Sequence, residues 1–132
     1  MAAADRPVDK PRPVYLDLFA IRQPLPAIVS ILHRASGALM FVAGIPLLLW
    51  LVQRSLASTE AFAALKQPLG TPLGKIVLLV LAWCYAYHLL AGLRHLALDL
   101  HIGIALAPAR RSAALVLMLS VLLALIVAVR LW

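Results

Sequence analysis

The sequence predicts an all-α integral membrane protein with three transmembrane helices. Its 132 residues are 64% hydrophobic and 13% charged, and the mean hydropathy is +1.00, which is far more apolar than a soluble domain of this length. Three runs of about 18 residues lack any charge, close to the ~20 residues that cross a ~30 Å hydrocarbon layer as a helix. These runs cover residues 35–52, 76–93 and 112–129.

The first 25 residues are predicted to form a cytoplasmic tail and an interfacial segment, ahead of a three-helix transmembrane domain over residues 26–132. The start of the chain is basic and proline-rich, too polar to bury itself, and no cleaved signal peptide is expected. Apolar side chains such as Phe19 then suit a membrane interface, and Pro24 and Pro26 favour the start of a helix.

The first helix is expected over about 26–52, with Ser30, His33 and Arg34 near the cytoplasmic boundary. Gly37 and Gly44 are seven residues apart, so they share one face that another helix can approach closely. Pro46 is expected to kink this helix, because a proline inside a helix cannot donate a backbone hydrogen bond.

The two later connections are simpler. Residues 53–75 contain two prolines and two glycines and are expected to form a loop, with one short helical turn around 60–65. The third span carries a row of small residues at helical spacing, Ser120, Ala124 and Ala128, which predicts a packing surface.

The net charge of +7 is better explained by a membrane than by nucleic acid, because no basic stripe with interleaved aromatic residues is present. The lipid bilayer is an expected partner and nucleic acid is not. Lysine and arginine concentrate before the first span and between the second and third, which places the N-terminus in the cytoplasm by the positive-inside rule. The eight on that side are Arg6, Lys10, Arg12, Arg22, Arg34, Arg94, Arg110 and Arg111, and the four opposite are Arg54, Lys66, Lys75 and Arg130.

The second span contains one histidine inside its apolar run, His88. Ionisable groups at membrane depth are costly, so a functional reason is the default. A neutral imidazole there could ligate haem iron, relay a proton or hydrogen-bond a neighbouring helix. The single cysteine of the chain excludes a multi-cysteine metal site within it.

One iron cannot use both His88 and His95, which lie on one helix face but ~10 Å apart along the axis. No other histidine is expected at the depth of His88, and Met40 and Met118 are poor alternatives. The second axial ligand is therefore expected from a partner subunit. On this interpretation the three helices form half of a haem-binding helical bundle that another subunit completes.

Haem propionates need cations or hydrogen-bond donors, and the cytoplasmic ends of the first two spans supply several. Arg94 lies six residues past His88, a plausible reach from iron to a propionate, although such cations also extend to lipid headgroups. The predicted propionate neighbours are His33, Arg34, Arg94 and His95.

Two further polar groups sit at this boundary. Ser30 and Arg34, four residues apart, share a helix face and offer a hydroxyl and a cation to a small polar ligand. Asp99 is expected to form a salt bridge with Arg94 or His95.

Three segments together resemble the cytochrome b556 membrane-anchor protein of bacterial and mitochondrial succinate dehydrogenase. They are RPVYLDL near the start, SILHRASG leading into the first span and HLLAGLRHLALD closing the second.

The resemblance implies an all-α anchor in the bacterial inner membrane that shares one haem b and a ubiquinone site with a second membrane-anchor subunit. An iron–sulfur subunit and a flavoprotein subunit that oxidises succinate complete such a complex. The matching positions imply that His88 is the axial haem ligand and that Ser30 and Arg34 line the quinone site. They imply that His33 and His95 lie near the propionates. The chain alone then holds no complete active site.

Three alternatives remain open at this point. A proton-conducting or transporter subunit would use His88 without haem. A purely structural anchor would need neither the histidine nor the serine. A quinol:fumarate reductase anchor would run the same chemistry in the opposite direction.

Overall fold

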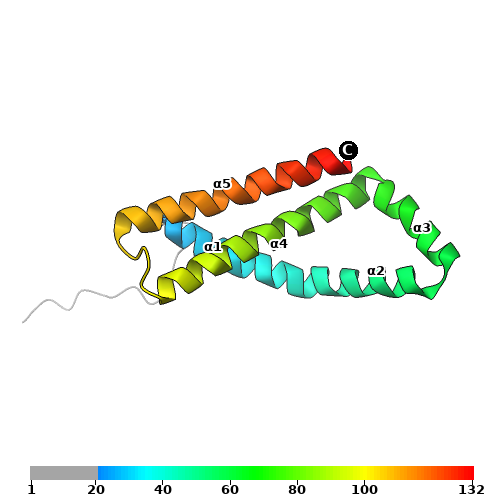
Figure 1. Ribbon diagram of the computed structural model, residues 1–132, viewed down its shortest axis with the longest axis horizontal. Helices are drawn as coiled ribbons and strands as arrows, with labels where there is room; N and C mark the ends of the chain where they lie inside the picture. The colour runs from blue at the N-terminus through cyan, green and yellow to red at the C-terminus, as the bar shows by residue number, and fades with distance from the viewer. Residues whose placement is uncertain (1–20) are drawn as a thin grey trace, which may run out of the picture.

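The computed structural model describes residues 21–132, so the predicted tail and most of the predicted interfacial segment lie outside the described residues. Over this range the chain forms helices joined by short connections (Figure 1). Three helical stretches are long and apolar enough to span a membrane: Leu25–Ala57, Pro72–Asp99 and Leu106–Leu131. The predicted fold class is confirmed, and each helix extends beyond the charge-free run that predicted it.

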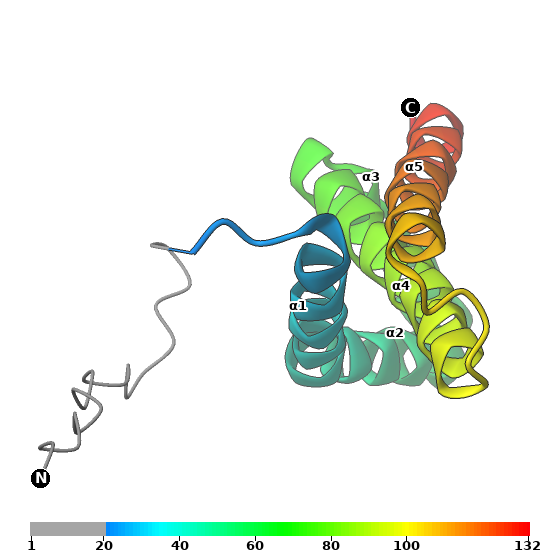
Figure 2. The same ribbon diagram turned by 90° about the vertical axis from the view of Figure 1, so that its left-hand side faces the viewer.

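The first span is helical throughout but is built from three segments, α1 (Leu25–Leu39), the π-helical turn η1 (Met40–Gly44) and α2 (Ile45–Ala57). Pro46 is the second residue of α2 and cannot donate to a carbonyl in the preceding turn. The wider π turn accommodates this loss. Figures 1 and 2 show that α2 leaves η1 in a different direction from α1, as the predicted kink requires.

The expected loop after the first span is wrong, because residues Thr59–Gly70 form a helix, α3. Its first turn is capped by the Ser58 hydroxyl, which accepts a hydrogen bond from the Ala61 amide at 3.1 Å. Pro68 stands within its last turn, close enough to the end that the helix is not extended further. Capping at the start, which satisfies an otherwise unpaired amide, outweighs the loop-forming composition that follows.

The second span, α4 (Pro72–Asp99), begins at a similar cap, with the Thr71 hydroxyl accepting from the Gly74 amide at 3.1 Å. The third span is α5 (Leu106–Leu131). Figure 1 shows that α1 begins, α4 ends and α5 begins at the same end of the bundle, which we call the α1 end. Its buried centre lies where these three helices meet, at Val29, Tyr87, Ala91, Ala113 and Val116.

Large apolar side chains are exposed over much of the remaining surface, as at Phe41, Leu56 and Val129. Such a surface suits hydrocarbon rather than water. The predicted small-residue row on α5 faces inward, with Ser120 fully buried and Ala124 and Ala128 half-buried. Small residues at the contacts therefore let the helix backbones approach, as predicted.

Candidate functional site

The contact between α1 and α4 is a close, antiparallel helix pair. Each glycine on this seam faces a larger residue of the other helix: Gly37 lies against the His88 ring, Gly44 against Leu81, and Gly92 on α4 against His33. The facing positions advance along α1 as they recede along α4, as antiparallel packing requires. The predicted glycine face of the first helix is thus the face that receives the candidate histidine.

The His88 ring is half-buried in this seam and is held at one nitrogen. Its Nδ1 lies 3.0 Å from the backbone carbonyl oxygen of His33 and 3.2 Å from the Ser36 hydroxyl. The Ser36 hydroxyl in turn donates to the same His33 carbonyl at 3.0 Å. Two polar groups, which are hydrogen-bonded to each other, therefore meet at Nδ1.

These contacts define the tautomer of His88. A carbonyl oxygen can only accept a hydrogen bond, so Nδ1 must carry the proton that it shares with the His33 carbonyl. In a neutral imidazole the other nitrogen then has a lone pair. Within residues 21–132, Nε2 of His88 has no hydrogen-bond partner. A neutral ring held in this way is in the form that binds a metal through Nε2.

The expectation that no other histidine lies at the depth of His88 is wrong. The His33 ring stacks on the His88 ring, with centroids 4.0 Å apart and an interplanar angle of 18°. It also approaches His95, with centroids 5.1 Å apart. His33 lies on the face of α1 that packs against α4, where it is also opposite Gly92. Rings stacked face to face do not point their nitrogens at one iron from opposite sides, so His33 is not a second axial ligand in this arrangement.

Arg94 lies on another face of α4, buried at 8% exposure. Its Nε donates to the Ser112 hydroxyl at 3.0 Å and its NH2 group donates to the Ala109 carbonyl at 3.3 Å, both on α5. The side chain therefore fastens the end of α4 to the beginning of α5. Its further contact with a propionate stays a prediction.

The expected boundary salt bridge of Asp99 is wrong within the described part of the chain. Asp99 is the exposed last residue of α4, whereas the Arg94 donors reach the opposite direction, to α5. The spacing of five residues places the two side chains on different helix faces.

Ser30 and Arg34 lie on α1 near the α1 end, and the helix places both on one face as predicted. Ser30 is half-buried and Arg34 is exposed. Among residues 21–132, neither side chain is hydrogen-bonded to another group. The structure thus leaves a hydroxyl and a guanidinium available to a ligand at this face.

Two polar side chains with clear roles were missed by the sequence reasoning. Ser36 holds Nδ1 of His88, and the Tyr87 hydroxyl donates to the Val29 carbonyl at 2.8 Å, in the buried centre. Both lie in or beside apolar runs, where a polar group calls for a partner. That signal was present for both, but the partner atoms are backbone carbonyls, which no residue pattern reveals.

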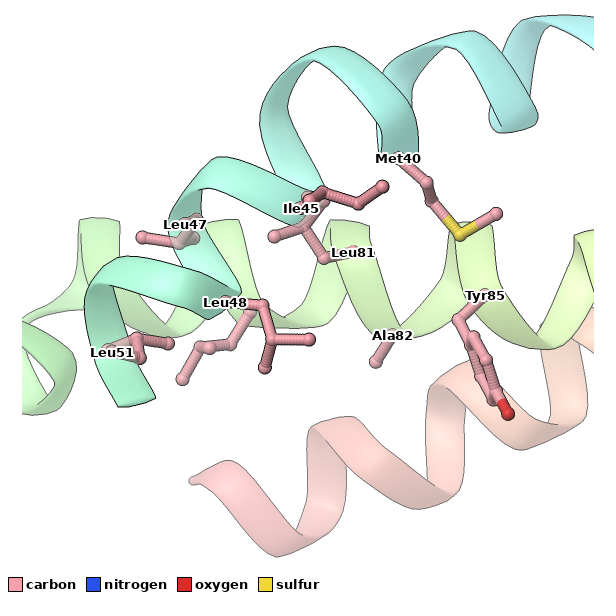
Figure 3. A pocket seen from close by; sticks show the side chains of 10 residues that line it. Met40, Ile45, Leu47, Leu48, Leu51, Leu81, Ala82 and Tyr85 are labelled. Atoms are coloured by element: carbon pink, nitrogen blue, oxygen red, sulfur yellow. The ribbon is translucent and has the colours of Figure 1, made fainter. Parts of the chain in front are cut away.

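An apolar cavity of about 400 Å³ lies between the first span and α4, apart from these polar residues. Figure 3 shows Met40 and Tyr85 at one end and leucine and isoleucine side chains at the other. No charged side chain lines it, so the cavity suits hydrocarbon rather than a polar head group.

The described residues contain no cluster of three or more histidine, cysteine or acidic side chains that could hold a bare metal ion. Iron in a porphyrin already has four ligands and needs only axial ligands from protein. A neutral imidazole fits that requirement when its Nδ1 is hydrogen-bonded to a carbonyl and its Nε2 has a lone pair. Of the two predicted alternatives, Met118 is largely exposed and Met40 lines the apolar cavity.

Comparison with known proteins agrees with the sequence resemblance. The sequence model of the family described as "Succinate dehydrogenase/Fumarate reductase transmembrane subunit" matches residues 8–127. The chain is 39% identical over 115 residues to the succinate dehydrogenase cytochrome b556 subunit of Paracoccus denitrificans, covering 87% of this chain and 88% of the relative. It is 37% identical over 122 residues to the protein of the same name from Coxiella burnetii, covering 92% and 97%.

Proposed function

This chain belongs to the family of succinate dehydrogenase/fumarate reductase transmembrane subunits, and from that premise we propose how it works as a cytochrome b556 subunit. It anchors the complex in the membrane, helps to bind one haem b and ubiquinone, and passes electrons from an iron–sulfur subunit to quinone. The single observation that carries this proposal is the His88 imidazole inside the second span, with Nδ1 at 3.0 Å from the His33 carbonyl and Nε2 without a partner among residues 21–132.

His88 is the proposed axial ligand of haem b. The names of both relatives include cytochrome b556, a b-type haem protein, and the donor set at His88 fits such a group. When bound, haem b supplies a one-electron site near the quinone. The protein contributes by orienting the ring, fixing its tautomer and excluding water with the apolar helices around it.

The second axial ligand comes from a second membrane-anchor subunit. Along the described chain the His33 ring is stacked on His88 rather than placed opposite it, and the His95 ring lies tilted beside His33. A haem held by one residue of this chain and one of a partner also joins the two subunits. His33, Arg34, Arg94 and His95 are the proposed neighbours of its propionates, on the side of His88 toward the α1 end.

Ser30 and Arg34 are the proposed quinone-binding residues. The Ser30 hydroxyl is suited to donate a hydrogen bond to a quinone carbonyl, and the Arg34 guanidinium to stabilise the negative charge that develops during reduction. Both groups are placed by the rigid helix α1, so little reorganisation is needed when charge appears.

The cytoplasmic side is assigned to the α1 end, which carries Arg22, Arg34, Arg110 and Arg111. The iron–sulfur subunit, with the flavoprotein subunit attached, then meets this end of an inner-membrane complex. The same binding groups would also serve fumarate reduction by quinol. Both relatives carry the name succinate dehydrogenase, which favours the direction from succinate to quinone.

The test replaces Ser30 by Ala and Arg34 by Leu in the assembled complex. Losing a neutral hydrogen bond of about 1 kcal/mol predicts a roughly fivefold slower quinone reduction, and losing a charge-assisted one of about 1.5–3 kcal/mol predicts roughly 10- to 100-fold. Succinate oxidation with an artificial electron acceptor should stay normal, because the flavoprotein is untouched.

Matched controls lie at the other end of the same span. Ser55 and Arg54 offer a serine and an arginine near the end of α2. Ser55→Ala and Arg54→Leu should leave quinone reduction normal. If Ser30→Ala and Arg34→Leu behave like these controls, the quinone assignment is wrong.

A further inference from the structure

Building on the proposed haem ligation by His88, we propose that Ser36 and Gly37 of α1 are positioning residues for that ligand. Gly37 provides the space in which the His88 ring is oriented, and Ser36 sets how strongly the ring donates electrons to iron through Nε2. Neither residue touches the metal. Both act through His88, from the helix that faces it.

Gly37 leaves room for the ring and for nothing larger. A Cβ atom added at this position would lie 2.8 Å from Cε1 and 3.3 Å from Nδ1 of His88. Real Cβ contacts are almost never that short, so any side chain at position 37 must displace the imidazole or separate α1 from α4. The orientation of the ring, and with it the direction of Nε2, therefore depends on residue 37 having no Cβ atom.

Ser36 controls the charge around Nδ1. The residue is 5% exposed and its hydroxyl gives its proton to the His33 carbonyl, so its oxygen presents lone pairs to the Nδ1 proton at 3.2 Å. The His33 carbonyl is a second acceptor at 3.0 Å. Two acceptors at one N–H group draw its proton partly away from the ring, and the ring becomes richer in electrons as a result.

This enrichment has a direction that an experiment can detect. A more electron-rich imidazole stabilises ferric over ferrous iron and lowers the midpoint potential. Removing the Ser36 oxygen takes away one of the two acceptors at Nδ1. Ser36→Ala should therefore raise the haem midpoint potential, while the haem stays bound.

The chain offers a matched control for each residue. Ser120 is also a buried serine whose hydroxyl donates to the carbonyl three residues earlier, at 2.9 Å, but it lies on α5 among apolar side chains. Gly44 shares the α1–α4 seam with Gly37, yet a Cβ there would meet its nearest neighbour at an ordinary 3.5 Å.

The experiment measures haem content, the optical and electron paramagnetic resonance spectra and the haem midpoint potential in the purified complex. We expect Ser36→Ala to raise the potential, Ser36→Thr to restore it by returning a hydroxyl, and Ser120→Ala to leave it unchanged. Gly37→Ala should lower haem content or change the ferric spectrum, while Gly44→Ala should do neither.

An unchanged potential and spectrum in Ser36→Ala would overturn the role of Ser36, and normal haem in Gly37→Ala would overturn that of Gly37. If Gly37→Ala does not assemble, Ser36→Ala with its threonine rescue still decides the proposal. A His88→Leu variant separates this inference from the proposed function: normal haem there refutes ligation itself, whereas lost haem with an unaffected Ser36→Ala refutes only the positioning role.

Discussion

At the scale of single residues, buried hydrogen bonds from α4 to backbone atoms of α1 hold the two helices in register. The Tyr87 hydroxyl reaches the Val29 carbonyl, and Nδ1 of His88 reaches the His33 carbonyl one turn further along α1. Each contact satisfies a polar side chain that hydrocarbon cannot solvate. The residue that carries the candidate chemistry is therefore also part of the helix–helix joint.

The Tyr87→Phe variant tests this joint. It removes one buried hydrogen bond and keeps the ring, so the complex should lose about 0.5–1.5 kcal/mol of stability, within the range measured for such bonds. Tyr85→Phe is the control, since Tyr85 is 65% exposed whereas Tyr87 is 0% exposed. The measurement is the thermal unfolding midpoint of the detergent-solubilised complex. Equal midpoints for the two variants would contradict the role given to Tyr87.

Sequence reasoning proposed His88, Ser30 and Arg34 as candidate site residues because ionisable or polar groups near an apolar run stand out, and their roles stay predictions. It misplaced His33, because the adjacent charge of Arg34 was taken to hold both residues at the membrane boundary. A helix turns by about 100° per residue, so neighbours in sequence face different surroundings. The contact between His33 and His88 depends on the packing of two helices, which one helix pattern does not specify.

At the scale of elements, α4 and α5 are fastened by Arg94 where the chain turns between them. The connection is short and includes His101 and Gly103, both with positive φ angles. Arg94 bridges it from inside by donating to Ser112 and to the Ala109 carbonyl. A planar guanidinium donates from two different nitrogens in a fixed geometry, which a lysine or glutamine does not reproduce.

Arg94→Gln should loosen the first turns of α5. Losing charge-assisted bonds worth about 1.5–3 kcal/mol predicts roughly 10- to 100-fold faster amide hydrogen exchange over residues 106–112. Arg54→Gln, at the exposed end of α2, is the control and should leave exchange there unchanged. Exchange that stays slow in Arg94→Gln would show that α5 does not depend on this arginine.

The three spans were predictable as elements because charge and hydropathy alone define them, and Pro46 marked the bend in the first. The helix α3 was not. Its prolines and glycines favour a loop, while the Ser58 cap and the alanine-containing segment after it favour a helix. The overall composition of this segment does not show which of these preferences dominates, because the outcome depends on where the cap and the prolines stand.

At the scale of the whole molecule, the chain belongs to a family of subunits that work within a larger complex. Few of its apolar side chains are buried within it, and the candidate haem ligand lies between two helices with one nitrogen lacking a partner in the described chain. Such a site fits a protein whose cofactor receives a further ligand from a neighbouring subunit. In the proposed assembly, the basic residues of the α1 end face the soluble partners, while the apolar flanks face lipid and the second anchor.

The most direct test of haem ligation is the reduced-minus-oxidised absorption spectrum of the purified complex with His88 replaced by Leu. We expect the b-type bands of the wild-type complex to disappear or shift strongly in His88→Leu. They should persist in His101→Asn, which alters a histidine in the exposed connection between α4 and α5. Unchanged b-type bands in His88→Leu, or a wild-type complex without them, would contradict haem ligation by this protein.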